Sequence, residues 1–245
     1  MIKQYIIKIL RAHSYRSLSS IARGRVFFII GCARSGTTSA AKILDTARNA
    51  VCLVEPEPKL SAESRAHLEG NLEFPIQALE EALGPRIRQH LAHWPIYGEK
   101  NVTLTAFIRE LYEHLSAKII WVTRDGRDVV QSMHNWHNEL FGNFYRECKE
   151  PGALSEDAKK VIAELPVKKD EADLSRPRPL PGDPYHEKWL ELSRHEMLCW
   201  YWAFINRRVL SEIKLLPSSA WFRLDYSSPN IAEQLHRAAH WIGLK

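Results

Sequence analysis

Short hydrophobic runs alternate with longer amphipathic stretches along this chain. The runs are rich in β-branched and aromatic residues and predict buried strands. They lie at 25–30, 50–54, 117–122 and 221–224, with a shorter candidate at 96–97. Apolar residues at three- and four-residue spacing predict helices at 38–44, 74–92, 103–115, 128–136, 187–215 and 231–243. This alternation predicts an α/β fold, a single domain whose central parallel sheet of about five strands is flanked by helices.

Two segments depart from the alternation. Residues 1–24 form a basic N-terminal extension with a predicted amphipathic helix over 2–12, and no Asp or Glu precedes Asp45. Docking of this helix on the domain is the simplest interpretation, while contact with a membrane surface and an organellar transit peptide stay open. The domain itself is expected to span 25–245. Within it, residues 149–186 contain repeated prolines and charges, which predict an insertion or lid with a short helix near 156–165.

Composition narrows the class of protein. With 245 residues, 45% of them hydrophobic and 26% charged, the chain is globular rather than disordered or fibrous. No apolar run reaches the ~20 residues that a membrane-spanning helix needs. The net charge of +5 weakly favours an anionic partner. No basic stripe with interleaved aromatic residues is present, so we expect no nucleic-acid partner.

The sequence gives little evidence for a metal site or for disulfide bonds. The four cysteines are scattered and form no ligand pair, which indicates reduced thiols in a cytoplasmic protein. His134 and His137 stand three residues apart, but no third ligand is spaced nearby, so a helix surface explains them better than a metal site. We therefore expect no metal.

The segment GCARSGTT at 31–38 has the frame of a phosphate-binding loop. It follows a predicted strand and opens a predicted helix, which is the context that such loops require. A P-loop NTPase has a lysine where this chain has Thr37, and that lysine reaches the β- and γ-phosphates. The cation stands instead at Arg34. The segment therefore predicts an anion site without ordinary ATP or GTP hydrolysis.

A second segment, KIIWVTRDGRDVVQS at 118–132, carries another pair of anion ligands. Arg124 stands where a predicted strand ends, which is the ligand side of an α/β sheet. Ser132 follows eight residues later on the next predicted helix. An arginine fork and a serine hydroxyl can converge on one phosphate.

These two segments together resemble the sulfotransferases that use 3′-phosphoadenosine 5′-phosphosulfate (PAPS). The C-terminal FRLDY at 222–226, followed by Pro229 and WIGL at 241–244, is weakly similar to the ending of that family. The resemblance implies a fold like that of P-loop nucleotide kinases, PAPS as donor, 3′-phosphoadenosine 5′-phosphate (PAP) as product, and no metal.

The resemblance also implies roles for individual residues. The first segment would bind the 5′-phosphosulfate, with Arg34 stabilising the leaving phosphate. The second would recognise the 3′-phosphate through Arg124 and Ser132. The hydroxyl and N–H donors of the loop would come from Ser35, Gly36, Thr37 and Thr38.

The expected general base differs between branches of the family. Cytosolic members carry Lys-Thr-His, and this chain has Lys100-Asn101-Val102, which keeps the lysine and lacks the histidine. Golgi-type and bacterial members use a Glu just after the second strand, and Glu55 stands there, with Glu57 as its competitor. By resemblance, Glu55 would be the base and Lys100 would contact the transferring sulfuryl group. This chain is closer to the Glu-base branch.

The sequence thus predicts a sulfotransferase that transfers a sulfuryl group in line to a hydroxyl or amine of a carbohydrate, lipid or small molecule. The acceptor is expected to enter near Glu55, Lys100 and residues 149–186. Two alternatives stay open: a kinase that uses Mg-ATP on a small molecule or nucleotide, and a nucleotide-binding homologue without activity. The acceptor and the oligomeric state are not readable from the sequence.

Overall fold

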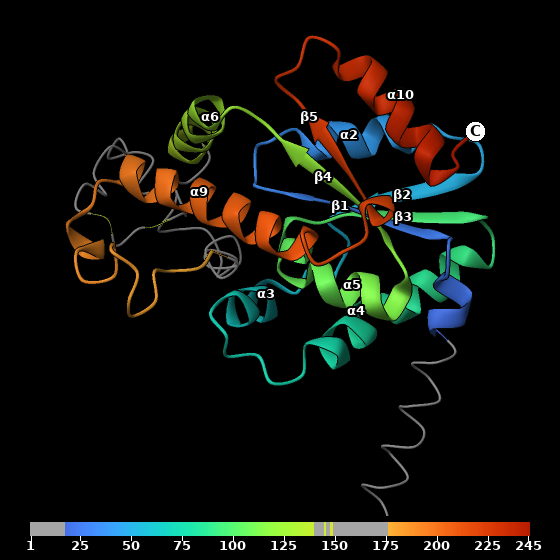
Figure 1. Ribbon diagram of the computed structural model, residues 1–245, viewed down its shortest axis with the longest axis horizontal. Coiled ribbons are helices and arrows are strands. Elements are labelled where there is room, and N and C mark those ends of the chain that lie inside the picture. The colour runs from blue at the N-terminus through green and yellow to red at the C-terminus, as the bar shows by residue number, and fades with distance from the viewer. Residues whose placement is uncertain (1–17, 140–144, 146–147, 149–175) are drawn as a thin grey trace, which may run out of the picture.

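A sheet of five parallel strands forms the centre of the protein (Figure 1). The computed structural model describes residues 18–139, 145, 148 and 176–245. The strands are β1 (Val26–Gly31), β2 (Ala50–Val54), β3 (Ile96–Lys100), β4 (Lys118–Thr123) and β5 (Trp221–Asp225). Their spatial order is β2-β3-β1-β4-β5, and every neighbouring pair is parallel. The predicted fold class is confirmed.

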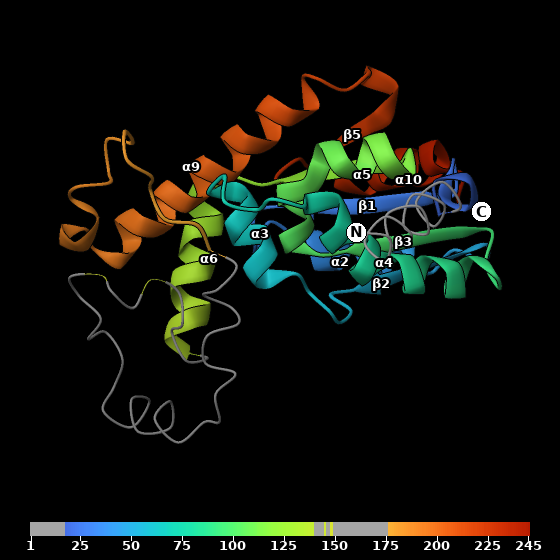
Figure 2. The same ribbon diagram turned by 90° about the horizontal axis from the view of Figure 1, so that it is seen from below.

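Helices cover both faces of the sheet, as buried parallel strands require. On one face lie α2 (Thr37–Leu44) and α10 (Ile231–Ile242), which enclose a smaller apolar cluster. On the other face lie α3 (Ser61–Leu68), α4 (Pro75–Leu91), α5 (Ile108–Leu115) and α9 (Arg194–Ile213), which enclose the main cluster. The helix α6 (Gly126–Glu139) follows β4 and packs on α9. Figure 2 shows α6 and α9 at the end of the molecule opposite the C-terminus.

Residues 18–24 belong to the packed structure. Residues 18–22 are helical, and Leu18 and Ala22 are fully buried in the main cluster. The next residue, Arg25, donates side-chain hydrogen bonds to the carbonyls of Leu91, Trp94 and Pro95. The helices expected at 2–12 and near 156–165 lie outside the described residues.

Several elements differ from the expected ones. The helix α3 was not predicted, because only Ser64 and Leu68 of its eight residues are buried and the segment has no apolar stripe. The helix expected at 103–115 is a 3-10 turn, η1 (Val102–Phe107), followed by α5. The helix expected at 187–215 consists of a short turn, η3 (Trp189–Glu191), and α9, because Ser193 and Glu196 form a capping box that starts the helix there.

Candidate functional site

The loop between β1 and α2 has a backbone that only glycine tolerates at two positions. Gly31 has a φ of +143°, and a Cβ there would lie 2.5 Å from the carbonyl oxygen of Val122. Gly36, the N-cap of α2, has a φ of +97° and lies against the ring of Tyr226. Arg34 is also left-handed, with a φ of +68°. These turns direct the chain sharply into α2 and leave the backbone N–H groups at the start of that helix available to an anion.

The hydroxyl side chains of the loop differ in exposure. The Ser35 hydroxyl is buried without a hydrogen-bond partner among the described residues, and Thr37 is buried beside it at the start of α2. Thr38 faces solvent. Buried hydroxyls are usually paired, so the orphaned Ser35 oxygen fits a loop that completes its hydrogen bonds with a ligand.

The second predicted segment meets the loop directly. The Arg34 Nε donates a hydrogen bond to the Ser132 Oγ on α6, over 3.2 Å. The Arg124 Nη1 donates to the backbone carbonyl of Arg34, over 3.5 Å, and its Nη2 lies 3.5 Å from a carboxylate oxygen of Asp128. Three residues predicted from two separate motifs therefore lie together at the carboxyl end of the sheet.

Glu55 and Lys100 form an ion pair at the ends of two neighbouring strands. The register places Val54 opposite Lys100, and the Glu55 N–H donates to the Lys100 carbonyl over 2.8 Å. The Lys100 residue is only 4% exposed, whereas the Glu55 side chain is 37% exposed. Burial lowers the pKa of Lys100, Glu55 opposes that change, and the cations Arg176 and Arg34 add to it.

The competing acid, Glu57, lies elsewhere. Its carboxylate pairs with Lys59 over 3.2 Å and is largely exposed. Its backbone carbonyl accepts from the Arg86 Nη1 over 2.9 Å. Of the two glutamates, Glu55 is therefore the one that reaches the buried cation and keeps a side exposed to an incoming molecule.

Sequence reasoning missed three contributors to this region. Thr105 of η1 exchanges hydrogen bonds with Gly31, accepting from its N–H over 3.1 Å. Tyr201 of α9 is buried in the main apolar cluster, and it is also hydrogen-bonded to Cys32 and to the backbone of Ala33. Arg176, in the proline-rich segment, lies over the Tyr201 ring and is 6% exposed. No local signal marks these residues, because each reaches the loop through long-range packing.

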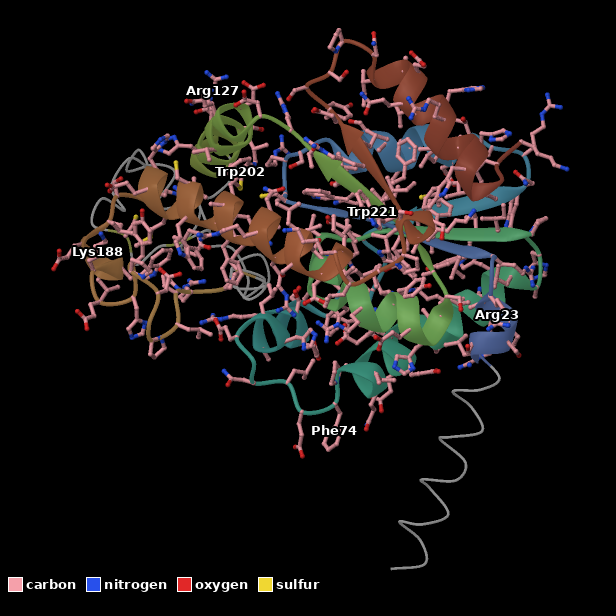
Figure 3. All side chains as sticks on the ribbon, viewed as in Figure 1. Arg23, Phe74, Arg127, Lys188, Trp202 and Trp221 are labelled. Carbon is pink, nitrogen blue, oxygen red and sulfur yellow. The ribbon has the colours of Figure 1, made fainter. Side chains whose placement is uncertain are left out.

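A cavity of about 1000 Å³ opens beside this site, between α6, α9 and the ends of β4 and β5. Arg124 lines it together with Gly126, Trp202, Asn206, Arg223 and Ser227. Arg127 and Trp202, both labelled in Figure 3, lie at this end of the molecule and line the same cavity. The cavity combines aromatic walls with a cationic rim, as a pocket for an anionic aromatic ligand would.

No metal cluster was found in the part of the chain that the structure describes. No group of three or more His, Cys, Asp or Glu side chains could hold an ion there. His134 lies edge-on to His195, with ring centres 6.5 Å apart. The pKa of His134 is lowered by burial, and the neighbouring Arg194 and His195 add to this.

Comparison with solved structures identifies a protein with a similar fold. The fold matches that of a known sulfotransferase domain. The sulfotransferase domain from the curacin biosynthetic pathway superimposes with a TM-score of 0.50 at 14% sequence identity, over 91% of this chain and 75% of that one. No protein-family model matches the chain, and no curated protein matches its sequence. No helix among the described residues is long and apolar enough to cross a membrane.

Proposed function

We propose that the protein is a sulfotransferase that moves a sulfuryl group from PAPS to a hydroxyl or amine of a carbohydrate, lipid or small molecule. The observation that carries this proposal is the meeting of Arg34, Arg124 and Ser132 beside the Glu55–Lys100 pair. A loop that lacks the P-loop lysine but gathers arginines suits a donor whose transferable group needs no Mg²⁺. The fold of a sulfotransferase domain supports the same class of reaction.

Each part of the donor would have its own residues. The loop residues 34–38 would bind the 5′-phosphosulfate, and the buried Ser35 hydroxyl would gain the partner it lacks. Arg124 and Ser132 would bind the 3′-phosphate. The cavity that Arg124 borders would receive the adenosine, where Trp202 offers an aromatic wall. A positively charged site of this kind stabilises the charge that develops on the leaving phosphate.

The transfer step needs a base and a cation at the sulfur. The acceptor oxygen forms a bond to sulfur, the bond from sulfur to the phosphate oxygen breaks, and its electron pair goes to the phosphate of PAP. The acceptor proton goes to the Glu55 carboxylate, which is exposed enough to be reached. On donor binding, Lys100 would release the Glu55 carboxylate with which it is now paired. It would then bind the sulfuryl oxygens from its buried position.

Calorimetric titration without Mg²⁺ tests the donor. We expect the wild type to bind PAP far more tightly than ADP, because only PAP carries the 3′-phosphate. Arg124→Ala should weaken PAP binding roughly 10- to 100-fold, the usual value of a charged hydrogen bond, and should leave ADP binding unchanged. Arg237→Ala, an exposed arginine on α10, serves as the control.

Three results would contradict the proposal. Equal or tighter binding of ADP would favour a kinase, and Mg-ATP turnover would then be measured. Indifference of PAP binding to Arg124→Ala would remove the 3′-phosphate site. Tight PAP binding without transfer to any acceptor would indicate a nucleotide-binding homologue.

A further inference from the structure

A proline-rich strap, residues 176–180, is fastened between α3 and α9. The Arg178 N–H donates to the Glu69 carboxylate over 3.3 Å, and its guanidinium lies 4.8 Å from the centre of the Tyr145 ring. The Tyr145 hydroxyl donates to the Pro177 carbonyl over 3.1 Å. The Arg178 Nη1 donates to the Arg176 carbonyl over 2.7 Å. These contacts hold the backbone around Arg176 in one place.

Arg176 packs on Tyr201, a residue that contacts the start of the anion-binding loop. Its guanidinium carbon is 5.0 Å from the centre of the Tyr201 ring. Tyr201 is itself hydrogen-bonded to Cys32 and to the backbone of Ala33, the first residues of the loop after β1. One aromatic ring therefore connects the strap's cation to the loop that carries Arg34.

Arg176 also shares its surroundings with Lys100. Both residues are almost completely buried, at 6% and 4% exposure. Burial is the main reason that the pKa of Lys100 is lowered, and the nearby positive charge of Arg176 lowers it further. Positive charges brought together in a poorly solvated place favour an anion among them. The donor would bring that anion.

We propose that Arg176 is a catalytic residue that binds the sulfuryl oxygens of the donor next to Lys100. The proposal rests on the proposed function. The bond changes are those given above: Arg176 forms no covalent bond, and its planar fork of donors matches two oxygens of one sulfuryl group. It neutralises their charge while sulfur passes from the phosphate oxygen to the acceptor.

PAP lacks the sulfuryl group, so a comparison of PAPS with PAP isolates this contact. Calorimetric titration of both nucleotides is performed on the wild type, Arg176→Met and Arg176→Lys. We expect Arg176→Met to weaken PAPS binding roughly 10- to 100-fold and PAP binding less than about 3-fold. Arg176→Lys keeps the charge without the fork and should lose part of the PAPS affinity. Arg237→Met is the matched control. Arg237, on α10, also lies over an aromatic ring, that of Phe222.

The outcomes separate this proposal from the general one. If the wild type does not prefer PAP to ADP, the sulfotransferase function itself fails. If it does, and Arg176→Met weakens PAPS and PAP equally, Arg176 has only a structural role. If neither affinity changes, Arg176 does not touch the donor. Should circular dichroism show that Arg176→Met is unfolded, Arg176→Lys decides: an unchanged ratio of PAPS to PAP affinity overturns the proposal.

Discussion

At the scale of single residues, Gly36 carries two separate constraints. Its φ of +97° lies in the left-handed region, and a Cβ would meet the Tyr226 ring at 2.6 Å. Gly182 has nearly the same backbone, with a φ of +95°, but nothing lies within 4 Å of its Cβ position. A comparison of alanine variants at the two positions therefore distinguishes the cost of backbone strain from the cost of crowding against Tyr226.

We expect Gly182→Ala to lower the free energy of unfolding by roughly 1–2 kcal/mol, the cost of a left-handed alanine. Gly36→Ala should lower it further and should also weaken PAP binding, because the loop must move away from Tyr226. Urea unfolding and calorimetry measure the two effects. Equal losses in the two variants, with PAP affinity intact, would show that the Tyr226 contact does not shape the loop.

The predictability of the site differs from residue to residue. Arg34, Arg124 and Ser132 stand in two contiguous motifs, each of which predicted an anion site, and the structure brings the three residues into contact. The choice between Glu55 and Glu57 depends on the register of β2 against β3, which sequence spacing does not give. Arg176 reaches the loop only through α9, so no local pattern could have pointed to it.

At the scale of elements, β3 carries Lys100 of the site and, next to it, the buried Glu99. Glu99 is fully buried and is held by the Arg86 Nη2 over 3.1 Å and by the Tyr97 hydroxyl over 2.6 Å. Arg86 also binds the Glu57 carbonyl, in the loop that follows Glu55. Burial raises the pKa of Glu99, while Arg86 and Tyr97 oppose that change.

We expect Arg86→Met to lower the free energy of unfolding by about 3–5 kcal/mol near neutral pH, because Glu99 would be left as a buried, unpaired charge. The pKa of Glu99 would rise further. An acid whose folded pKa exceeds its unfolded pKa stabilises the fold at low pH and loses that contribution as pH rises. The loss should therefore be smaller at mildly acidic pH, as measured by urea unfolding at several pH values.

Two variants control the experiment on Arg86. Adding Glu99→Gln to Arg86→Met removes the buried charge and should recover part of the stability. Lys59→Met breaks an exposed ion pair and should cost no more than about 1 kcal/mol. A loss in Arg86→Met that is the same at every pH would show that Glu99 is not the source of the penalty.

The same strand shows why some elements were predicted only in part. Hydrophobicity predicted a strand only at 96–97, because Glu99 and Lys100 are charged and do not resemble buried strand residues. Both are buried because partners from other elements neutralise them, Arg86 for Glu99 and Glu55 for Lys100. Burial by pairing leaves no hydrophobic pattern.

At the scale of the whole molecule, the parallel α/β architecture was predictable and the order of its strands was not. Alternating strands and helices imply parallel strands, and each strand has at least a short hydrophobic run that marks its place in the chain. The order β2-β3-β1-β4-β5 depends on which way each crossover turns along the sheet, and that choice is made by packing of the finished core.

The N-terminal segment adds to that core. Because Leu18 is 1% exposed within the main cluster, we expect Leu18→Ala to lower the free energy of unfolding by about 2–5 kcal/mol. Ile43→Ala, which shortens a hydrophobic side chain that is 48% exposed, is the control and should cost far less. Thermal and urea unfolding give the comparison. A loss no larger than that of the control would show that residues 18–24 are dispensable to the domain.

The final residues are fastened at the far end of the sheet from the site. The Asn49 side chain donates to the Gly243 carbonyl and accepts from the Lys245 N–H, each over 2.9 Å. Asn49 directly precedes β2, at the amino ends of the strands, and Figure 1 places the C-terminus away from α6 and α9. A biosensor chip coupled through residue 245 would thus present the loop of Arg34 and the cavity beside it to the flowing solution.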